Sequence, residues 1–474
     1  MRRIALAVGL VAVGTATACE VSQTPTSPNL APTPEFARVV RQESVGINVV
    51  LRQPATDAIL AELGQYGRVT GRIDALRAVF LLAPRADIET LRALPFVEAA
   101  NPDGERSAGP PLPPVQASDF TNGLSTWNLD AVGVTDLFVG RTVDADGSGV
   151  YVGVLDTGLL ESWRYYFPEE RIAVAYARSF TGGGALGGGN VATQPNKWER
   201  DVESHGTHVT STILGYSLGG VPINGVAPRA TVIPVKVLNN NGSGWSSVIA
   251  QGIVYVADLK AGPLAGSPVV INMSLGGSQL DAVEQAAIDY AIARGVIVVA
   301  SAGNRGDAGM GYPGGYAPVI SVGAAGWAGE WVGGGAWWVA GNVADPTNPN
   351  HFYVTDFSSR AKAGQDLDVL APGSWVVGPW QLNQGHTSYY FLGGTSMASP
   401  HVAGLVALMA QADPGLSAGQ AEAVLEATAL PLPAGSRNVL AGPGGPVQTF
   451  TWGADAHGSG LVSAAAALAA VGGS

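Results

Sequence analysis

The sequence predicts an α/β protein with a doubly wound parallel sheet, preceded by a small α+β domain. In the larger, C-terminal part, continuous apolar runs of strand length alternate with helix-length segments, which is typical of parallel strands buried on both faces. Nearer the N-terminus, four shorter strand-like runs enclose two helix-like segments, and a stretch rich in Pro, Gly and Ser follows them. The 474 residues, of which 46% are hydrophobic and 13% charged, are enough for both cores.

Residues 37–103 are predicted to form the small domain. VGINVVL at 45–51 indicates a strand, and ATDAILAELG at 55–64 indicates a helix that stops at a glycine. RVTGRI, ALRAVFLLA, a helix in RADIETLRALP and a strand in FVEAA follow. This β-α-β-β-α-β order is the ferredoxin-like pattern. Residues 104–120, which begin GERSAGPPLPP, have no apolar period and are predicted as a linker.

The larger domain is predicted over residues 121–474. Its expected strands include VYVGVLDTG at 150–158, ATVIPVKVL, VVINMSLGG, GVIVVASAGN and PVISVGAA. Helices are expected in SSVIAQGIVYVADLKA and LDAVEQAAIDYAIARG. Ligands of such sheets bind at the carboxyl ends of the strands, so functional side chains are expected there.

The first residues have the pattern of a signal for export. Within 1–18, two arginines precede a short apolar run, and Ala-Thr-Ala forms a small-residue cleavage signal. The apolar run is too short to span a bilayer as a helix. Cys19, the one cysteine of the chain, follows directly, where bacterial lipoprotein signals also place a cysteine, so it is a candidate lipidation site. The alternative is a free thiol, and in either case residues 19–36 are predicted as a disordered polar tether.

The charge of the chain limits its partners. The formal net charge is −12, which argues against nucleic acid, because phosphate binding requires basic surface. Mutual repulsion of such charge favours a monomer. Membrane contact is expected only through a lipid on Cys19.

Four polar residues follow or open predicted elements of the large domain. Asp156 ends a strand, His205 opens the helix HGTHVTSTILG, and Asn304 ends ASAGN just past a strand. Ser396 lies in GGTSMASPHVAG, at the start of an apolar helical run. A carboxylate, an imidazole and a hydroxyl are the groups that acyl transfer requires, and an amide can donate to an oxyanion.

DTG after a strand, HGTHV, SAGN and GTSMASPHVAG together resemble the motifs of the subtilisin-like serine proteases. The resemblance implies an endopeptidase in which Ser396 is the nucleophile and His205 the general base. Asp156 would orient the imidazole, and Asn304 would donate to the oxyanion. The small domain resembles the inhibitory propeptide of that family. The resemblance also implies polypeptide substrates and no catalytic cofactor or metal; structural calcium is common in the family, but no ligands can be assigned.

Two glycine-containing segments resemble the family's binding segments for the substrate backbone, GSGW at 242–245 and SLGG at 274–277. An extended peptide would pair with them as an added strand. Gly276 and Gly277 would leave room for a side-chain pocket. The predicted substrate-binding residues are Gly242, Ser243, Gly244, Ser274, Leu275, Gly276, Gly277, Ser301, Ala302 and Gly303.

Other conspicuous residues have structural interpretations. Ser399 and His401 lie near Ser396, but His401 is five positions away and would point elsewhere on a helix. The long segment 326–354 contains four tryptophans that are expected to pin it to the body rather than bind substrate. TGGGALGGGN at 181–190 is predicted as a surface loop, and DADGSG as a surface turn rather than a calcium loop.

Two other functions compete with the endopeptidase. An esterase of the α/β-hydrolase type would need its Asp and His after the serine, whereas both precede Ser396. A non-catalytic binding protein on the same scaffold would not need all four catalytic positions. If residues 37–103 are a propeptide, we expect residues 98–105 to lie along the cleft, with self-cleavage between Asp103 and Phe120.

Overall fold

The computed structural model describes residues 44–107, 115–116, 125–184, 190–381 and 388–472. The predicted signal peptide, the tether and Cys19 lie outside these residues, as do most of the linker and the middle of the 181–190 loop. Contacts divide the chain at Arg41, so that every described residue belongs to the unit Gln42–Ser474.

A four-stranded antiparallel sheet forms the N-terminal part of this unit. Its order is β2-β3-β1-β4, with helices α1 and α2 between β1 and β2 and between β3 and β4. The predicted β-α-β-β-α-β order is therefore present. Alternate residues of β1 pack on the two helices, whereas Val50 joins a core cluster of the large sheet. The elements are β1 (Ser44–Leu51), α1 (Asp57–Leu63), β2 (Arg68–Ile73), β3 (Ala78–Pro84), α2 (Ile88–Arg92) and β4 (Val97–Pro102).

The large sheet has nine strands in the order β11-β10-β14-β9-β16-β17-β18-β19, with β20 also paired to β18. All neighbours are parallel except β11 and β19, which pair antiparallel at the two ends. The strands are β9 (Tyr151–Asp156), β10 (Arg178–Thr181), β11 (Ala192–Thr193), β14 (Thr231–Lys236), β16 (Val269–Met273), β17 (Val296–Ser301), β18 (Ile320–Trp327), β19 (Phe352–Val354) and β20 (Val369–Pro372).

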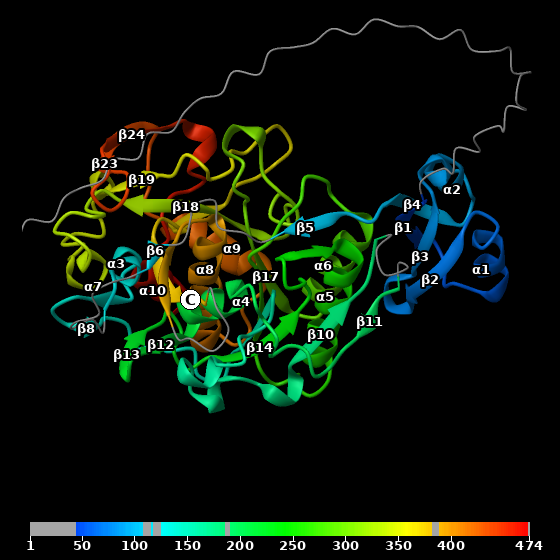
Figure 1. The fold of residues 1–474 in the computed structure, drawn as a ribbon, viewed down its shortest axis with the longest axis horizontal. Coiled ribbons are helices and arrows are strands. Elements are labelled where there is room, and N and C mark those ends of the chain that lie inside the picture. The colour runs from blue at the N-terminus through cyan, green and yellow to red at the C-terminus, as the bar shows by residue number, and fades with distance from the viewer. Residues whose placement is uncertain (1–43, 108–114, 117–124, 185–189, 382–387, 473–474) are drawn as a thin grey trace, which may run out of the picture. The chain divides into compact units, whose positions relative to one another are not determined.

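Helices cover both faces of this sheet (Figure 1). In β9, Val152 and Val154 belong to the core cluster that includes α4 (His205–Leu214) and α8 (Thr395–Ala412). Leu155 belongs instead to the cluster with helices α5 and α6. Alternating side chains thus enter two apolar layers, which explains the continuous hydrophobic runs and confirms the predicted doubly wound sheet. The helices of the second layer are α5 (Ser246–Ala261) and α6 (Ala282–Ile292).

Smaller elements complete the large domain. They are α3 (Trp127–Ala131), β7 (Thr135–Asp136), β8 (Gly140–Arg141), β12 (Gly215–Leu218), β13 (Val221–Asn224), α7 (Trp337–Ala340), β21 (Val376–Pro379), β22 (Tyr389–Leu392), α9 (Ala418–Thr428), β23 (Gly435–Leu440), β24 (Val447–Trp452) and α10 (Ala464–Gly472).

The predicted linker, 104–120, contains two short strands. β5 (Glu105–Ser107) pairs with β15 (Ser243–Trp245), and β6 (Val115–Gln116) pairs with β22. Figure 1 shows β5 running from the small sheet to the large domain. Backbone hydrogen bonds to β15 and β22 hold these two strands in place. They therefore need no alternation of hydrophobic residues, which is the pattern by which a strand is predicted from sequence.

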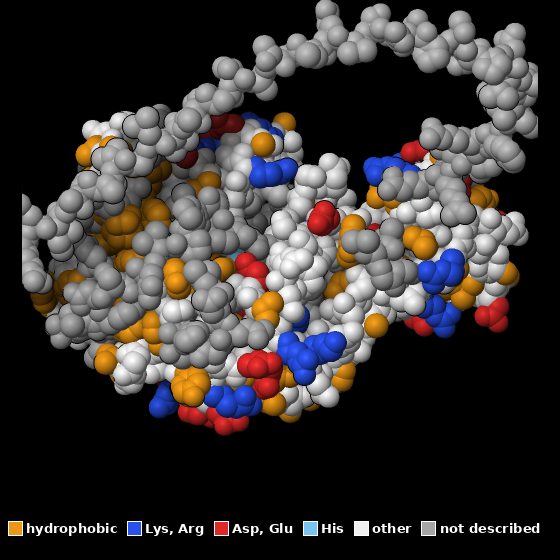
Figure 2. Space-filling view, viewed as in Figure 1, with side chains coloured by type: hydrophobic (Ala, Val, Ile, Leu, Met, Phe, Trp, Pro, Cys, Tyr) orange, Lys and Arg blue, Asp and Glu red, His pale blue; other side chains and the backbone are white. Residues whose placement is uncertain are grey.

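The surface carries few charges, and their signs are mixed. On the face shown in Figure 2, Lys and Arg side chains are interspersed with Asp and Glu rather than gathered in one basic field. Among the described residues, none of the helices combines the length and apolarity needed to cross a bilayer.

The tryptophan-rich segment 326–354 is packed against the body. Trp331, Trp337 and Trp338 are at most 7% exposed. The Trp337 ring lies 5.9 Å from that of Trp127 and stacks on Phe391 at 5.9 Å. The aromatic side chains therefore pin this segment, as the sequence predicted.

Replacing Trp337 by alanine should lower the free energy of unfolding by about 3–5 kcal/mol, because a large buried ring leaves a cavity. Urea unfolding, followed by fluorescence with Ser396→Ala present in both chains, measures this loss. If the chain is the expected endopeptidase, Trp337→Ala with Ser396 intact should hydrolyse peptides at an unchanged rate below the unfolding transition. A selective rise in KM without loss of stability would instead assign the segment to substrate binding.

Candidate active site

Asp156 and His205 form a buried pair at the carboxyl end of β9. Asp156 is the last residue of that strand, and His205 is the first residue of α4. His205 Nδ1 lies 2.8 Å from Asp156 Oδ1 and 3.0 Å from Oδ2, and both side chains are 0% exposed. A proton on Nδ1 bonded to the carboxylate leaves Nε2 as the basic nitrogen. Nε2 is buried and has no hydrogen-bond partner among the described residues.

A glycine allows α4 to start this close to the strand. A Cβ on Gly206 would lie 2.3 Å from the carbonyl oxygen of Gly158. The Gly206 N–H also donates to Thr157 Oγ1 at 2.8 Å. The glycine of HGTHV thus lets the helix N-terminus approach the strand end that carries Asp156.

Ser396 is the second residue of α8 and lies at the helix N-terminus. Its Oγ donates to the carbonyl of Ser274 at 3.3 Å rather than to His205 Nε2. The Ser396 carbonyl in turn accepts from Ser274 Oγ at 2.8 Å. Its N–H is one of the amides that a helix start leaves without an intrahelical partner. Catalytic hydrogen bonds are often long or misaligned without substrate, so the lack of this bond is compatible with the roles expected of Ser396 and His205.

Thr395 fixes the orientation of the Asn304 side chain. Asn304 Oδ1 accepts from Thr395 N at 2.8 Å and from Thr395 Oγ1 at 2.9 Å. The amide nitrogen of Asn304 therefore points away from Thr395. Asn304 and Ser396 line one cavity of about 350 Å³. Two donors, the Asn304 amide and the helix N-terminus, thus border the same space as the Ser396 hydroxyl.

The predicted substrate-binding segments flank β5. Ser243 and Gly244 lie in β15 and pair with Ser107 and Arg106. On the other side, Ser107 N donates to Gly276 O at 3.2 Å, and Gly276 N donates to Ser107 O at 3.1 Å. The chain's own strand thus fills the groove between the two segments. It runs over Glu105–Ser107, a few residues beyond the expected 98–105, because residues 97–102 belong to β4 in the small sheet.

Of the other predicted binding residues, some line the cavity that contains Ser396 and some do not. Leu275, Gly276, Gly277, Ser301 and Gly303 line the same 350 Å³ cavity. Ser274 contacts Ser396 instead, Ala302 is buried in a small cluster with Met310 and Leu367, and Gly242 forms the turn before β15.

The neighbouring polar residues have structural partners. His401 Nε2 accepts from Asn128 at 2.8 Å, and Nδ1 donates to the Met397 carbonyl at 2.8 Å. Ser399 Oγ donates to Asn272 Oδ1 at 2.6 Å. Burial lowers the pKa of His401 to about 4, so it is neutral. These contacts agree with the structural interpretation of both residues.

Carboxylates raise the basicity of His205. Burial alone would lower its pKa, but Asp156, Glu203 and Asp201 outweigh this effect and raise the pKa to about 9. A carboxylate oxygen of Glu203 also accepts a hydrogen bond from the backbone N–H of His205 at 3.0 Å. Glu203 and Thr395 were not predicted from the sequence, although each stands within two residues of a predicted catalytic residue. Within the described residues, no group of three or more His, Cys, Asp or Glu side chains is arranged to hold a metal ion.

In a plot of kcat/KM for peptide hydrolysis against pH, Glu203→Gln should shift the acid limb to lower pH by roughly one unit. As the expected general base, His205 must be neutral to accept a proton, and removal of a nearby negative charge lowers its pKa. Glutamine still has a side-chain oxygen that can accept from the backbone N–H of His205, so the substitution removes the charge and keeps this hydrogen bond. The control is Glu199→Gln, because Glu199 bonds Trp163 and Arg164 and not His205. Identical profiles for the two variants and wild type between pH 5 and 10 would contradict this role of Glu203.

The comparisons with known proteins agree with this geometry. Residues 147–453 match the model of the subtilase family, Peptidase S8. This chain belongs to the subtilase family. It is 35% identical to subtilisin DY of Bacillus licheniformis over 60% of this chain and 84% of the relative. It is 34% identical to subtilisin Savinase of Lederbergia lenta over 68% and 91%.

Solved structures show the same fold. Fervidolysin from Fervidobacterium pennivorans, a keratinolytic enzyme related to subtilisin, matches with a TM-score of 0.62 and 24% identity, over 90% of this chain and 61% of that one. Sphericase matches with a TM-score of 0.51 and 29% identity, over 73% and 99%. The subtilase described here is accordingly a serine endopeptidase.

Proposed function

We propose that this subtilase is an exported endopeptidase made as a self-processed zymogen, with Asp156, His205, Ser396 and Asn304 as its catalytic residues. One observation carries the proposal. The strand Glu105–Ser107 pairs with both predicted substrate-binding segments and runs to the cavity that holds Ser396 and Asn304. This pairing supports the proposal, because an extended substrate would bind by adding a strand to the same two segments.

In the proposed mechanism, Ser396 Oγ attacks the carbonyl carbon of the scissile bond while His205 Nε2 takes the hydroxyl proton. The tetrahedral intermediate collapses as His205 returns this proton to the leaving amine, which leaves an acyl-enzyme. A water molecule, deprotonated by the same nitrogen, then attacks the acyl carbon; the bond to Ser396 Oγ breaks, and His205 returns the proton to Oγ as the acid leaves. Asp156 holds the imidazole in the required tautomer and stabilises its charged form.

The oxyanion would be stabilised by two fixed donors. Thr395 holds the Asn304 carbonyl oxygen, which leaves the amide nitrogen free to donate. The Ser396 N–H is the second donor, and the dipole of α8 adds favourable potential at the helix N-terminus.

Residues 37–103 would act as the inhibitory propeptide. Asp103 accepts from Ser247 N at 3.0 Å and from Ser247 Oγ at 2.6 Å, at the first turn of α5. Asp281, the N-cap of α6, accepts from Asn48 at 3.0 Å and from Asn101 at 2.8 Å. These contacts hold the small sheet on two helix N-termini while β5 occupies the groove. Cleavage beyond Ser107 and before Phe120 would release the groove.

Export rests on the signal pattern in residues 1–18, and Cys19 remains the proposed acceptor of a lipid. A lipidated protein should enter the detergent phase of a phase-partition experiment, because firm anchoring needs more than one acyl chain. Cys19→Ser should move it to the aqueous phase. A wild-type protein that is wholly aqueous would leave export without an anchor.

Hydrolysis of casein and of a small nitrophenyl ester by the processed chain tests the function. We expect cleavage of both and loss of both after treatment with phenylmethanesulfonyl fluoride. Ester turnover without any casein cleavage would favour the esterase. Binding of casein without hydrolysis of either substrate would favour the non-catalytic binding protein.

A further inference from the structure

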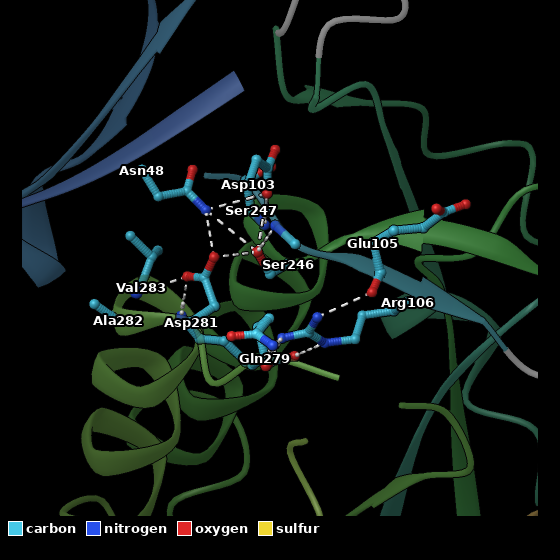
Figure 3. Close-up of polar contacts among 12 residues, drawn as sticks. Asn48, Asp103, Glu105, Arg106, Ser246, Ser247, Gln279, Asp281, Ala282 and Val283 are labelled. Atoms are coloured by element: carbon cyan, nitrogen blue, oxygen red, sulfur yellow. Dashed lines mark hydrogen bonds and ion pairs between the residues drawn. The ribbon is translucent and has the colours of Figure 1, made fainter. Parts of the chain in front are cut away.

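Arg106 is a buried cation in the strand that fills the groove. Its side chain is 1% exposed and that of Glu284 is 0% exposed. The guanidinium bonds both carboxylate oxygens of Glu284, with Nη2 2.5 Å from Oε2 and Nε 3.2 Å from Oε1. It also donates to the carbonyl oxygens of Gln279, at 3.2 Å, and Glu105, at 3.0 Å (Figure 3). Such a two-pronged arrangement matches the planar guanidinium and not an ammonium.

The walls of this site belong to the large domain. Glu284 lies in the first turn of α6, and Gln279 lies in the loop before that helix. A Cβ on Gly277 would lie 2.5 Å from Arg106 Nη1 and 2.4 Å from the Glu105 carbonyl oxygen, so glycine makes room for the bound strand and its side chain. We call the space bordered by Gly277, Gln279 and Glu284 the Glu284 site.

The Glu284 site is built for a positive charge. Both Glu284 carboxylate oxygens bond to Arg106, and no other side chain of the described residues bonds to them. Burial raises the pKa of Glu284, and Arg106 opposes this rise. A carboxylate at this depth is costly to leave unpaired, whereas an arginine satisfies it with two bonds. A hydrophobic side chain would leave the carboxylate desolvated and unpaired.

The pairing of β5 with Gly276 places the Glu284 site at a fixed distance along the strand from the predicted catalytic residues. Ser107, the next residue, bonds to Gly276 through both its N–H and its carbonyl, and it borders the cavity that contains Ser396 and Asn304. Arg106 thus lies upstream of the position where the chain would be cut. A substrate that pairs with the same two segments would place one of its upstream side chains in the Glu284 site.

We propose that Glu284 is a specificity-determining residue that selects substrates with arginine at the upstream position held here by Arg106. The inference rests on the proposed function, because it treats β5 as the stand-in for a substrate. In the precursor Arg106 occupies the Glu284 site, and after cleavage the same site binds a side chain of the substrate. The chemical class of substrate is therefore a polypeptide with an arginine at one fixed distance before the scissile bond.

The test is digestion of a mixed peptide library by the processed enzyme, with every cut mapped by mass spectrometry. We expect arginine to be enriched at one upstream position. Synthetic peptides that differ only there, with Arg, Lys, Leu or citrulline, then give kcat/KM. Arginine should exceed citrulline, its neutral analogue, by roughly tenfold to a hundredfold, because the buried carboxylate distinguishes charge rather than shape.

Glu284→Leu should abolish this preference and favour the leucine peptide. Because Arg106 would lose its partner in the precursor, the variant is made as Arg106→Leu/Glu284→Leu, in which two apolar side chains replace the buried pair. Cleavage beyond Ser107 removes residue 106, so the processed enzyme carries Glu284→Leu alone. Asp289→Asn is the matched control, since Asp289 also lies in α6 but bonds Tyr316 at the surface; it should keep the preference for arginine.

Three outcomes overturn the inference. An active enzyme that cuts the four peptides equally, or one whose preference for arginine survives Glu284→Leu, would overturn it alone and leave the proposed function standing. Absence of hydrolysis of every peptide by all variants and by wild type would overturn the proposed function and this inference with it.

Discussion

Replacing Ser396 by alanine should reduce kcat for peptide hydrolysis by about a millionfold, the loss in kcat that removal of the nucleophile causes in subtilisin. Ser396 Oγ makes one bond, to the Ser274 carbonyl at 3.3 Å. Its removal creates almost no cavity, so the melting temperature should stay close to that of wild type. The purified variant should also remain uncut, because the proposed self-processing depends on the same hydroxyl.

Ser399→Ala is the matched control for this substitution. Ser399 lies one turn further along α8, and its hydroxyl donates to Asn272 Oδ1 in the core. Loss of that bond should lower the free energy of unfolding by about 1–3 kcal/mol while peptide hydrolysis continues. If Ser399→Ala were inactive and Ser396→Ala active, the assignment of the nucleophile would be wrong. Cutting of the Ser396→Ala precursor in a protease-free host would refute self-processing.

Asn304→Ala should lower kcat by about a hundredfold to a thousandfold, with little change in KM. This magnitude is the one known for loss of the oxyanion amide in subtilisin, a relative of this chain. The expectation rests on the two bonds that Thr395 donates to Asn304 Oδ1, because they turn the Asn304 amide nitrogen away from Thr395. An interaction made only in the transition state affects kcat and kcat/KM equally.

Thr395→Val refines the same prediction. Valine removes the hydroxyl that bonds Asn304 Oδ1 and keeps the backbone N–H that bonds the same oxygen. Its loss of kcat should therefore be smaller than that of Asn304→Ala. A variant at Asn304 that raised KM and left kcat unchanged would identify a ground-state binding residue instead of an oxyanion donor.

The sequence predicted the strands and helices that carry these residues. Asp156 was expected at a strand end and His205 at a helix start, and they are the last residue of β9 and the first of α4. These positions follow from local signals, namely apolar runs and small residues at the turns. The two-layer core followed from the same runs, because strands buried on both faces need apolar residues at every position.

Long-range pairings were not predictable in the same way. Arg106 lies in a Pro- and Gly-rich stretch that has no apolar period, and Glu284 is 178 residues further along the chain. Their pairing depends on backbone bonds of β5 that leave no mark on side-chain pattern. The pKa of His205 likewise depends on how deeply it is buried and on the approach of Glu203, which only the folded chain defines.

The most direct test of the account is the site of covalent labelling by a fluorophosphonate, which reacts with an activated serine. The processed wild-type chain should acquire one adduct, and fragment spectra should locate it on Ser396. Labelling should weaken as pH falls, because His205 becomes protonated and no longer activates the hydroxyl. An adduct on Ser399, or no adduct on a protein that circular dichroism shows to be folded, would contradict the account.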